Sequence, residues 1–140
     1  RDVSITAINI DAQAAGLDCS NTFTKTINLI LPPLVADFDY TPFEACFPSA
    51  IQVTNNSTGN LFEWQLIDQN GVVQAVSNLD NPTFFIANPG DYTIFLRASN
   101  TITGQFALAD NSGVGANAMP GKSPVRIYPT PQAAFQARPT

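Results

Sequence analysis

Histidine is absent from this chain of 140 residues. Without an imidazole, the chain cannot form a Ser-His-Asp or Cys-His nucleophile or a metal site with histidine ligands. Charged residues are scarce as well, at 12% of the sequence, which is about half the usual share. The six lysines and arginines are scattered, and binding of nucleic acid depends on a basic patch, so we expect no nucleic-acid partner. The net charge of -5 and the scarcity of lysine favour an extracellular location.

Long apolar runs are also missing. No stretch approaches the roughly 18 apolar residues of a membrane-spanning helix, so we expect no direct insertion into a membrane. Hydrophobic residues nevertheless make up 44% of the chain, which separates it from solvated disordered polymers. They occur in short alternating runs between turns that contain many of the eleven prolines and eight glycines. This distribution indicates many short strands, in a chain about one domain long.

The clearest strand follows the turn sequence Pro89-Gly90-Asp91. From Tyr92 to Ala98, apolar residues occupy alternate positions, which is the pattern of a half-buried strand in an antiparallel sheet. A tyrosine just inside such a strand can bury its ring and bond its hydroxyl back to the chain, as in the tyrosine corner of immunoglobulin-like sandwiches. We predict this arrangement for Tyr92.

Similar alternation marks the other strands between residues 33 and 130. We expect one core to contain Phe38, Val53, Trp64, Leu66, Tyr92, Ile94, Leu96 and Ile127. The Asn-Gly pair at 70–71 is typical of a hairpin turn, and residues 100–122 are interpreted as a long loop before the last strand. About seven short strands with regularly spaced turns predict an all-β, seven-stranded antiparallel β-sandwich.

The sequence also repeats itself at a long period. Asp2-Val3-Ser4-Ile5 matches Asp91-Tyr92-Thr93-Ile94, and residues 32–42 match residues 129–139. The period of roughly 97 residues is too long for a solenoid and suits separate domains in series. We therefore predict a tandem array in which 1–32 holds the last strands of one domain, 33–130 is a complete domain, and 131–140 begins a third.

Several short motifs occur in an order that resembles the PKD (polycystic kidney disease) domain. They are Ala36-x-Phe38, Pro42, Cys46-x-Pro48, Ile51-x-Val53-x-Asn55-x-Ser57, Phe62-x-Trp64, Asn81-Pro82 and Pro89-Gly90-Asp91-Tyr92-Thr93-Ile94. The resemblance covers essentially all of 33–130 and implies a seven-stranded immunoglobulin-like module repeated along extracellular proteins. The form with an early Cys-x-Pro is similar to those of very large surface proteins of Bacteroidota, including gliding-motility adhesins exported by the type IX secretion system.

The resemblance also bears on the two cysteines. In the family, an early cysteine often pairs with one near the last strand of the same unit. Cys46 occupies the early position and Cys19 the late position of the preceding unit, so neither has a partner in its own unit within these 140 residues. A bond between the two would need Cα atoms within about 7 Å. We expect Cys46 to be unpaired and buried.

Candidate sites for metals and catalysis are weak. The aspartates that could suggest calcium are Asp37, Asp39, Asp68, Asp80 and Asp91. Calcium takes six to eight oxygen ligands, and no compact Asp-x-Asp-x-Asp-Gly loop is present, so we interpret the alternate acids as the solvated face of strands. Nor does the spacing of Glu44 or Glu63 to these acids indicate the carboxylate pair of a glycosidase. We expect no catalytic residue, no metal and no cofactor.

Most aromatic side chains should belong to the core. Phe95 and one of Phe84 and Phe85 are the only ones that we expect to face outward, and hence the only candidates for a sugar-binding platform.

We expect a non-catalytic spacer and adhesion segment of a long, repetitive cell-surface protein. The alternative is a carbohydrate- or protein-binding accessory module of a secreted hydrolase. Neighbouring repeats of the same chain are the expected partners, with surface glycans or other cell-surface proteins as further candidates. In an immunoglobulin-like topology the 100–122 loop faces the preceding unit, so we predict that Phe106 and Leu108 pack near Pro32 and Pro33 and stiffen the junction.

Overall fold

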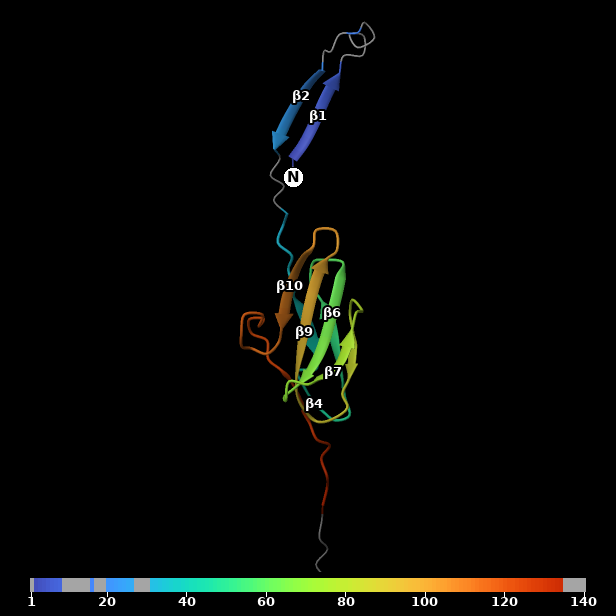
Figure 1. Ribbon diagram of the computed structural model, residues 1–140. Helices are drawn as coiled ribbons and strands as arrows, with labels where there is room; N and C mark the ends of the chain where they lie inside the picture. Colours follow the sequence, from blue (N-terminus) through green and yellow to red (C-terminus); the bar gives the residue numbers. More distant parts are fainter. Residues whose placement is uncertain (1, 9–15, 17–19, 27–30, 135–140) are drawn as a thin grey trace, which may run out of the picture. The chain divides into compact units, whose positions relative to one another are not determined.

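The computed structural model describes residues 2–8, 16, 20–26 and 31–134. The chain divides into two compact units, residues 1–33 and 34–140. Within the described residues every helix or strand assigned is a strand (Figure 1). No helix in this part of the chain is long and apolar enough to cross a membrane. The all-β class predicted from the alternation of apolar residues is confirmed.

The first unit contains two antiparallel strands, β1 (Asp2–Ile8) and β2 (Ser20–Thr26). β1 lies where the alternation of Val3, Ile5 and Ala7 in the sequence predicts a strand. The alternation of Ile27, Leu29 and Leu31 predicts a second strand, but residues 27–30 lie outside the described residues, and Leu31 is not in a strand. β2 precedes the predicted strand along the chain. Its alternate threonines favour a strand, but they do not form an apolar face that the sequence pattern would reveal. That this unit ends a PKD-like domain stays a prediction.

The second unit folds into two sheets. Its strands are β3 (Phe38–Thr41), β4 (Glu44–Cys46), β5 (Ala50–Asn55), β6 (Leu61–Asp68), β7 (Val73–Ser77), β8 (Thr83–Phe85), β9 (Gly90–Asn100), β10 (Gln105–Asp110) and β11 (Val125–Tyr128). The larger sheet has the order β4-β11-β9-β6-β7, with β10 also paired to β9, and the smaller sheet has the order β3-β5-β8. Side chains from both sheets share one core.

The core contains all eight side chains predicted for it, each no more than 4% exposed. Trp64 of β6 lies at its centre and meets the ring of Phe38 from β3 edge-on, with 5.3 Å between the ring centroids. The indole Nε1 donates a hydrogen bond to the carbonyl oxygen of Leu79 at 2.9 Å, so burying the tryptophan leaves no polar atom of its side chain unpaired. This contact joins the two sheets through their largest side chains.

The start of β9 is fastened by the predicted tyrosine. The ring of Tyr92 is buried, and its hydroxyl donates to the carbonyl oxygen of Asn88 at 2.6 Å. The bond ties the turn before β9 back to the strand itself. The prediction made for Tyr92 is confirmed.

The interpretation of residues 100–122 as a loop is wrong. Residues 105–110 form β10, which pairs with residues 95–100, the C-terminal half of β9. The sequence pattern misled because the inward positions of β10 carry small residues, Ala107 and the buried Ala109, while the large Phe106 points outward and is 58% exposed. In this strand the largest apolar side chain lies on the outward face, so a pattern of large apolar residues predicts the wrong face as buried.

The second unit also has nine strands where about seven were predicted, and one pair is not antiparallel. β4 was missed because three residues are too few to show alternation. It pairs in parallel with β11, with Glu44 opposite Arg126 and Cys46 opposite Tyr128. The remaining strand pairs of the unit are antiparallel. The two-sheet architecture is thus confirmed, and the purely antiparallel pairing is corrected.

Candidate functional site: the segment between β10 and β11

The main cluster of polar contacts lies in residues 111–124. This segment connects β10 to β11, and both of these strands pair with β9. Asn111, fully buried, holds the point of departure. Its Oδ1 accepts from the backbone N–H of Ile94 at 2.7 Å, and its Nδ2 donates to the carbonyl oxygen of Ser123 at 3.0 Å. The side chain thereby replaces the missing strand neighbour of Ile94, since a buried backbone N–H must find an acceptor.

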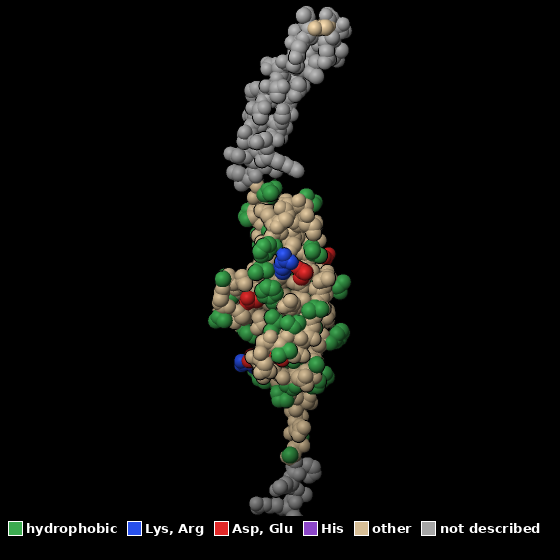
Figure 2. All heavy atoms as spheres, in the orientation of Figure 1, with side chains coloured by type: hydrophobic (Ala, Val, Ile, Leu, Met, Phe, Trp, Pro, Cys, Tyr) green, Lys and Arg blue, Asp and Glu red, His purple; other side chains and the backbone are tan. Residues whose placement is uncertain are grey.

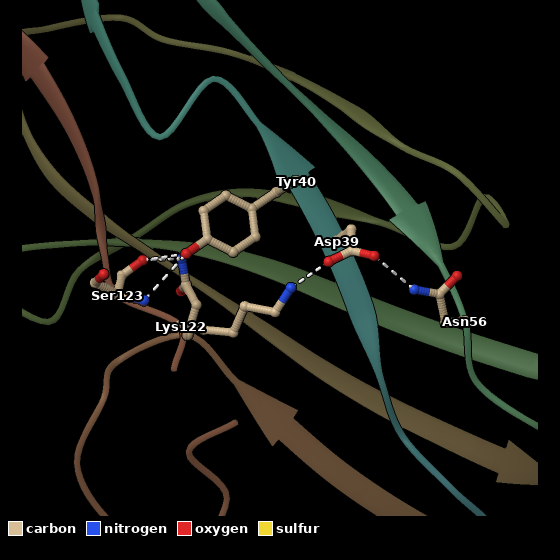
Figure 3. Close-up of polar contacts among 6 residues, drawn as sticks. Asp39, Tyr40, Asn56, Lys122 and Ser123 are labelled. Carbon is tan, nitrogen blue, oxygen red and sulfur yellow. Dashed lines mark hydrogen bonds and ion pairs between the residues drawn. The ribbon is translucent and has the colours of Figure 1, made fainter. Parts of the chain in front are cut away.

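The returning end of the segment contacts the smaller sheet (Figure 3). The hydroxyl of Tyr40 on β3 donates to the carbonyl oxygen of Ser123 and accepts from the backbone N–H of Ser123 at 3.1 Å. The ammonium of Lys122 pairs with the carboxylate of Asp39, which also accepts from Asn56 Nδ2 at 3.0 Å. Residues from β3 and from the segment before β11 are therefore joined across the open edge of the sandwich.

The electrostatics of this cluster are those of an exposed ion pair. Hydrogen bonding by Lys122, with a further bond from Asn56, lowers the pKa of Asp39, and the same bond to Asp39 raises the pKa of Lys122. Both shifts stabilise the charged forms, so neither group is poised to exchange a proton near neutral pH. The cluster fastens the segment to the fold. No residue of it was singled out from the sequence for this role.

The candidate acids are dispersed over the second unit. Asp91 pairs with Arg126, Glu63 pairs with Arg97 at 2.7 Å, and Asp68 accepts hydrogen bonds within its own turn. Among the described residues, no three or more acidic, cysteine or histidine side chains lie close enough to hold a metal ion. The carboxylates of Asp39, Asp68 and Asp91 are used in ion pairs and turn bonds. Absence of a calcium requirement stays a prediction.

We expect the melting temperature of the chain to be the same in calcium and in a chelator. A ligand that binds only the folded state must raise the melting temperature, and the described carboxylates do not converge. Differential scanning calorimetry on residues 1–140 in each buffer checks this. A rise of several degrees with calcium would show that a site exists.

The exposed aromatic side chains only partly match the prediction. Phe85 is 82% exposed and Phe84 is buried, as expected for one of the two, whereas Phe95 is half-buried. Phe43 and Phe106, which were not among the aromatic side chains expected to face outward, are 60% and 58% exposed. On the face drawn in Figure 2, hydrophobic side chains are spread among polar ones over the second unit.

Cys46 is exposed and unpaired among the described residues, so the prediction that it is buried is wrong. It ends the short strand β4, in which only the central residue, Ala45, is turned toward the core. The position of Cys19 lies outside the described residues.

Two of the four proposed junction residues, Phe106 and Leu108, lie in a strand and not in the expected loop. Phe106 lies on β10 with the guanidinium of Arg97 above its ring, 5.2 Å from the centroid, and Leu108 is partly buried on the same strand. The element beside Asn60 is the turn after β9, where Thr101 N–H donates to Asn60 Oδ1 at 3.0 Å. Pro32 and Pro33 are exposed. Contact between them and Phe106 or Leu108 stays a prediction.

Comparison with known proteins adds no assignment. No family model matches the chain, and no curated protein matches it.

Proposed function

We propose that this chain is a non-catalytic structural and adhesion segment of a long, repetitive cell-surface protein. In this proposal the second unit is an immunoglobulin-like, PKD-like domain, one of a tandem array that acts as a spacer and stalk outside the cell. Neighbouring repeats are its partners, and surface glycans or other surface proteins are contacted by the array. The observation that carries the proposal is the path of the chain through the second unit.

The chain enters and leaves the second unit at opposite ends. At one end Val35 exchanges hydrogen bonds with Thr58, near the end of β9 at Ser99. At the other end Tyr128 follows the last core residues and accepts from the backbone N–H of Phe47 at 2.8 Å. Figure 1 shows the entering segment beside the turn between β9 and β10 and the departing segment beyond β4. Such a path spaces whatever is attached to its two ends.

The arrangement of β4 and the last strand, β11, suits tension along this path. β4 follows β3, the first strand of the second unit, on the entering side of the chain, β11 continues into the departing chain, and β4 and β11 run in parallel. Pulling the ends apart would slide β4 along β11. The hydrogen bonds between the two strands run across the pulling direction, so they break together. Arg126 N–H donates to the carbonyl oxygen of Phe43 at 2.9 Å in this contact.

The features that support a PKD-like immunoglobulin domain are the central tryptophan, the tyrosine corner at Tyr92 and two sheets around one core. The low share of charged residues is compatible with a surface protein. Secretion by a type IX route, and a role in gliding motility, follow only from the sequence resemblance.

A second candidate function is an accessory module that binds carbohydrate or protein for a secreted hydrolase. Three phenylalanines that are more than half exposed, Phe43, Phe85 and Phe106, favour it. Exposed aromatic rings are common at binding surfaces.

Solution scattering tests the spacer function. Chains with one, two and three copies of residues 31–134 in series should lengthen by roughly 36 Å or more per copy, because the eleven residues of β9 alone span that distance at about 3.3 Å per residue. Units that fold back on one another would lengthen the particle far less, and that result would contradict the proposal.

A further inference from the structure

A hollow of about 350 Å³ opens on the solvent side of the large sheet, beside its edge strand β4. We call it the Phe43 hollow. It is lined by Phe43, Glu44, Asp91, Ser123, Pro124 and Arg126. The sequence did not single it out because its residues come from three separate parts of the chain. The sheet brings them together.

Strand register places three of the charges in one row. Arg126 on β11 lies opposite Glu44 on β4 and opposite Asp91 on β9. Its Nε is 2.9 Å from Asp91 Oδ1 and its Nη2 is 3.2 Å from Asp91 Oδ2, which fixes the plane of the guanidinium. Hydrogen bonding by Arg126 lowers the pKa of Asp91, so this pair is charged at neutral pH. Glu44 on the other flank is exposed, and its nearest donor is the hydroxyl of Tyr128 at 3.5 Å.

An aromatic ring stands beside this row. Phe43 is 60% exposed, yet it is held from within by the ring of Tyr40, at 5.1 Å between centroids and an interplanar angle of 73°. Tyr40 is itself fixed by the backbone of Ser123. A ring that is positioned in advance and open to solvent loses little conformational freedom when it is covered.

We infer that the Phe43 hollow binds a neutral pyranose sugar. The weakly polar C–H face of a pyranose fits the electron-rich face of Phe43. Two neighbouring hydroxyls can donate to the Glu44 carboxylate and accept from the remaining N–H groups of Arg126, which together fix the orientation of the ligand. Two acids against one base in the lining, and a chain charge of -5, disfavour anionic ligands.

This inference deepens the adhesive part of the proposed function, on which it rests, by naming a ligand class and a position. The spacer function does not depend on it. If scattering shows extended arrays and no sugar binds, only the inference fails. If sugar binds to arrays that fold back, only the spacer function fails.

The test uses the whole chain, residues 1–140, titrated with methyl glycosides of glucose, galactose and mannose. Amide chemical shifts in NMR spectra report where each sugar binds. For a single monosaccharide, ordinary ligand efficiency gives a dissociation constant on the order of 1 mM. We expect shifts at residues 43–44, 91 and 124–126 with at least one of the three glycosides.

Three variants locate the site. Phe43→Ala should weaken binding about tenfold or more, because it removes the apolar platform. Glu44→Gln keeps the shape of an exposed side chain but loses a charged acceptor, and should weaken binding severalfold. Phe85→Ala removes an even more exposed ring from β8 and should leave binding unchanged. Melting temperatures of all variants establish that each is folded.

The inference is overturned if no binding of any of the three glycosides is detected at a sugar concentration about ten times the expected dissociation constant. It is also overturned if folded Glu44→Gln and Phe43→Ala bind as tightly as the parent chain, or if Phe85→Ala is the variant that loses binding. A lysine-rich peptide is the remaining comparison. Its binding at the hollow, without any sugar binding, would identify a site for cationic groups instead.

Discussion

Replacing Trp64 with alanine should lower the free energy of unfolding of the second unit by about 3–5 kcal/mol. The side chain is 1% exposed, contacts Phe38 across the two sheets and satisfies the carbonyl oxygen of Leu79. Its removal leaves both a cavity and an unpaired carbonyl group. Because whole domains are stable by only about 5–15 kcal/mol, much of the protein should be unfolded at moderate temperature.

Urea denaturation of residues 1–140, followed by circular dichroism, measures this change. Fluorescence is unsuitable because Trp64 is the sole tryptophan. Val76→Ala is the matched control, since this side chain is 72% exposed on β7 and its loss should change stability by less than about 0.5 kcal/mol. Equal effects of the two substitutions would show that Trp64 is not the centre of the core.

The second large effect is expected for Asn111→Leu. The substitution keeps the branched shape of the side chain but removes the acceptor of Ile94 N–H and one donor to the Ser123 carbonyl oxygen. That carbonyl oxygen keeps its bond from the Tyr40 hydroxyl, whereas Ile94 N–H is left unpaired, so we expect a loss of about 1–3 kcal/mol. The amide of Ile94 should also exchange its hydrogen faster than in the parent chain.

Asn117→Ala provides the control within the same segment. Asn117 takes part through its backbone, whose carbonyl oxygen accepts from Asp110 N–H at 2.8 Å, so trimming its side chain should have little effect. Urea denaturation gives the stabilities and NMR hydrogen exchange gives the rate at Ile94. If Asn111→Leu is as stable as Asn117→Ala, the asparagine does not fasten the segment.

The parts of the fold that the sequence predicts are those with large apolar side chains on the inward face. β6 and β9 are recognised because Trp64 and Leu66, and likewise Ile94 and Leu96, occupy alternate positions and all point inward. β10 breaks this rule because its buried positions are filled by alanine. β4 is not recognised from the sequence because it is a strand through its pairing with β11, which is distant along the chain, and not through a pattern of its own.

The polar contacts could not be read from the sequence for a related reason. The role of Asn111 is defined by Ile94 and Ser123, which the fold brings to it from other positions along the chain. Nothing in its neighbours Asp110 and Ser112 distinguishes it from a loop asparagine. The same holds for the Phe43 hollow, whose charged row exists only through the register of β4, β11 and β9.

Single-molecule force measurement tests whether the second unit transmits tension between its two ends. Residues 1–140, with Cys19→Ser and Cys46→Ser, are held either by the two termini or by the C-terminus and a cysteine introduced as Asn70→Cys. Asn70 lies in the turn after β6, at the same end of the unit as β11, because Asp68 and Val125 both lie opposite Tyr92.

Pulling between Asn70→Cys and the C-terminus separates neighbouring strands of the large sheet sideways, so that their hydrogen bonds break one after another. Pulling between the two termini slides β4 along β11, so that the hydrogen bonds between these two strands break together. We expect a clearly higher unfolding force for the second unit when it is held by its termini. An equal or lower force in that direction would contradict it.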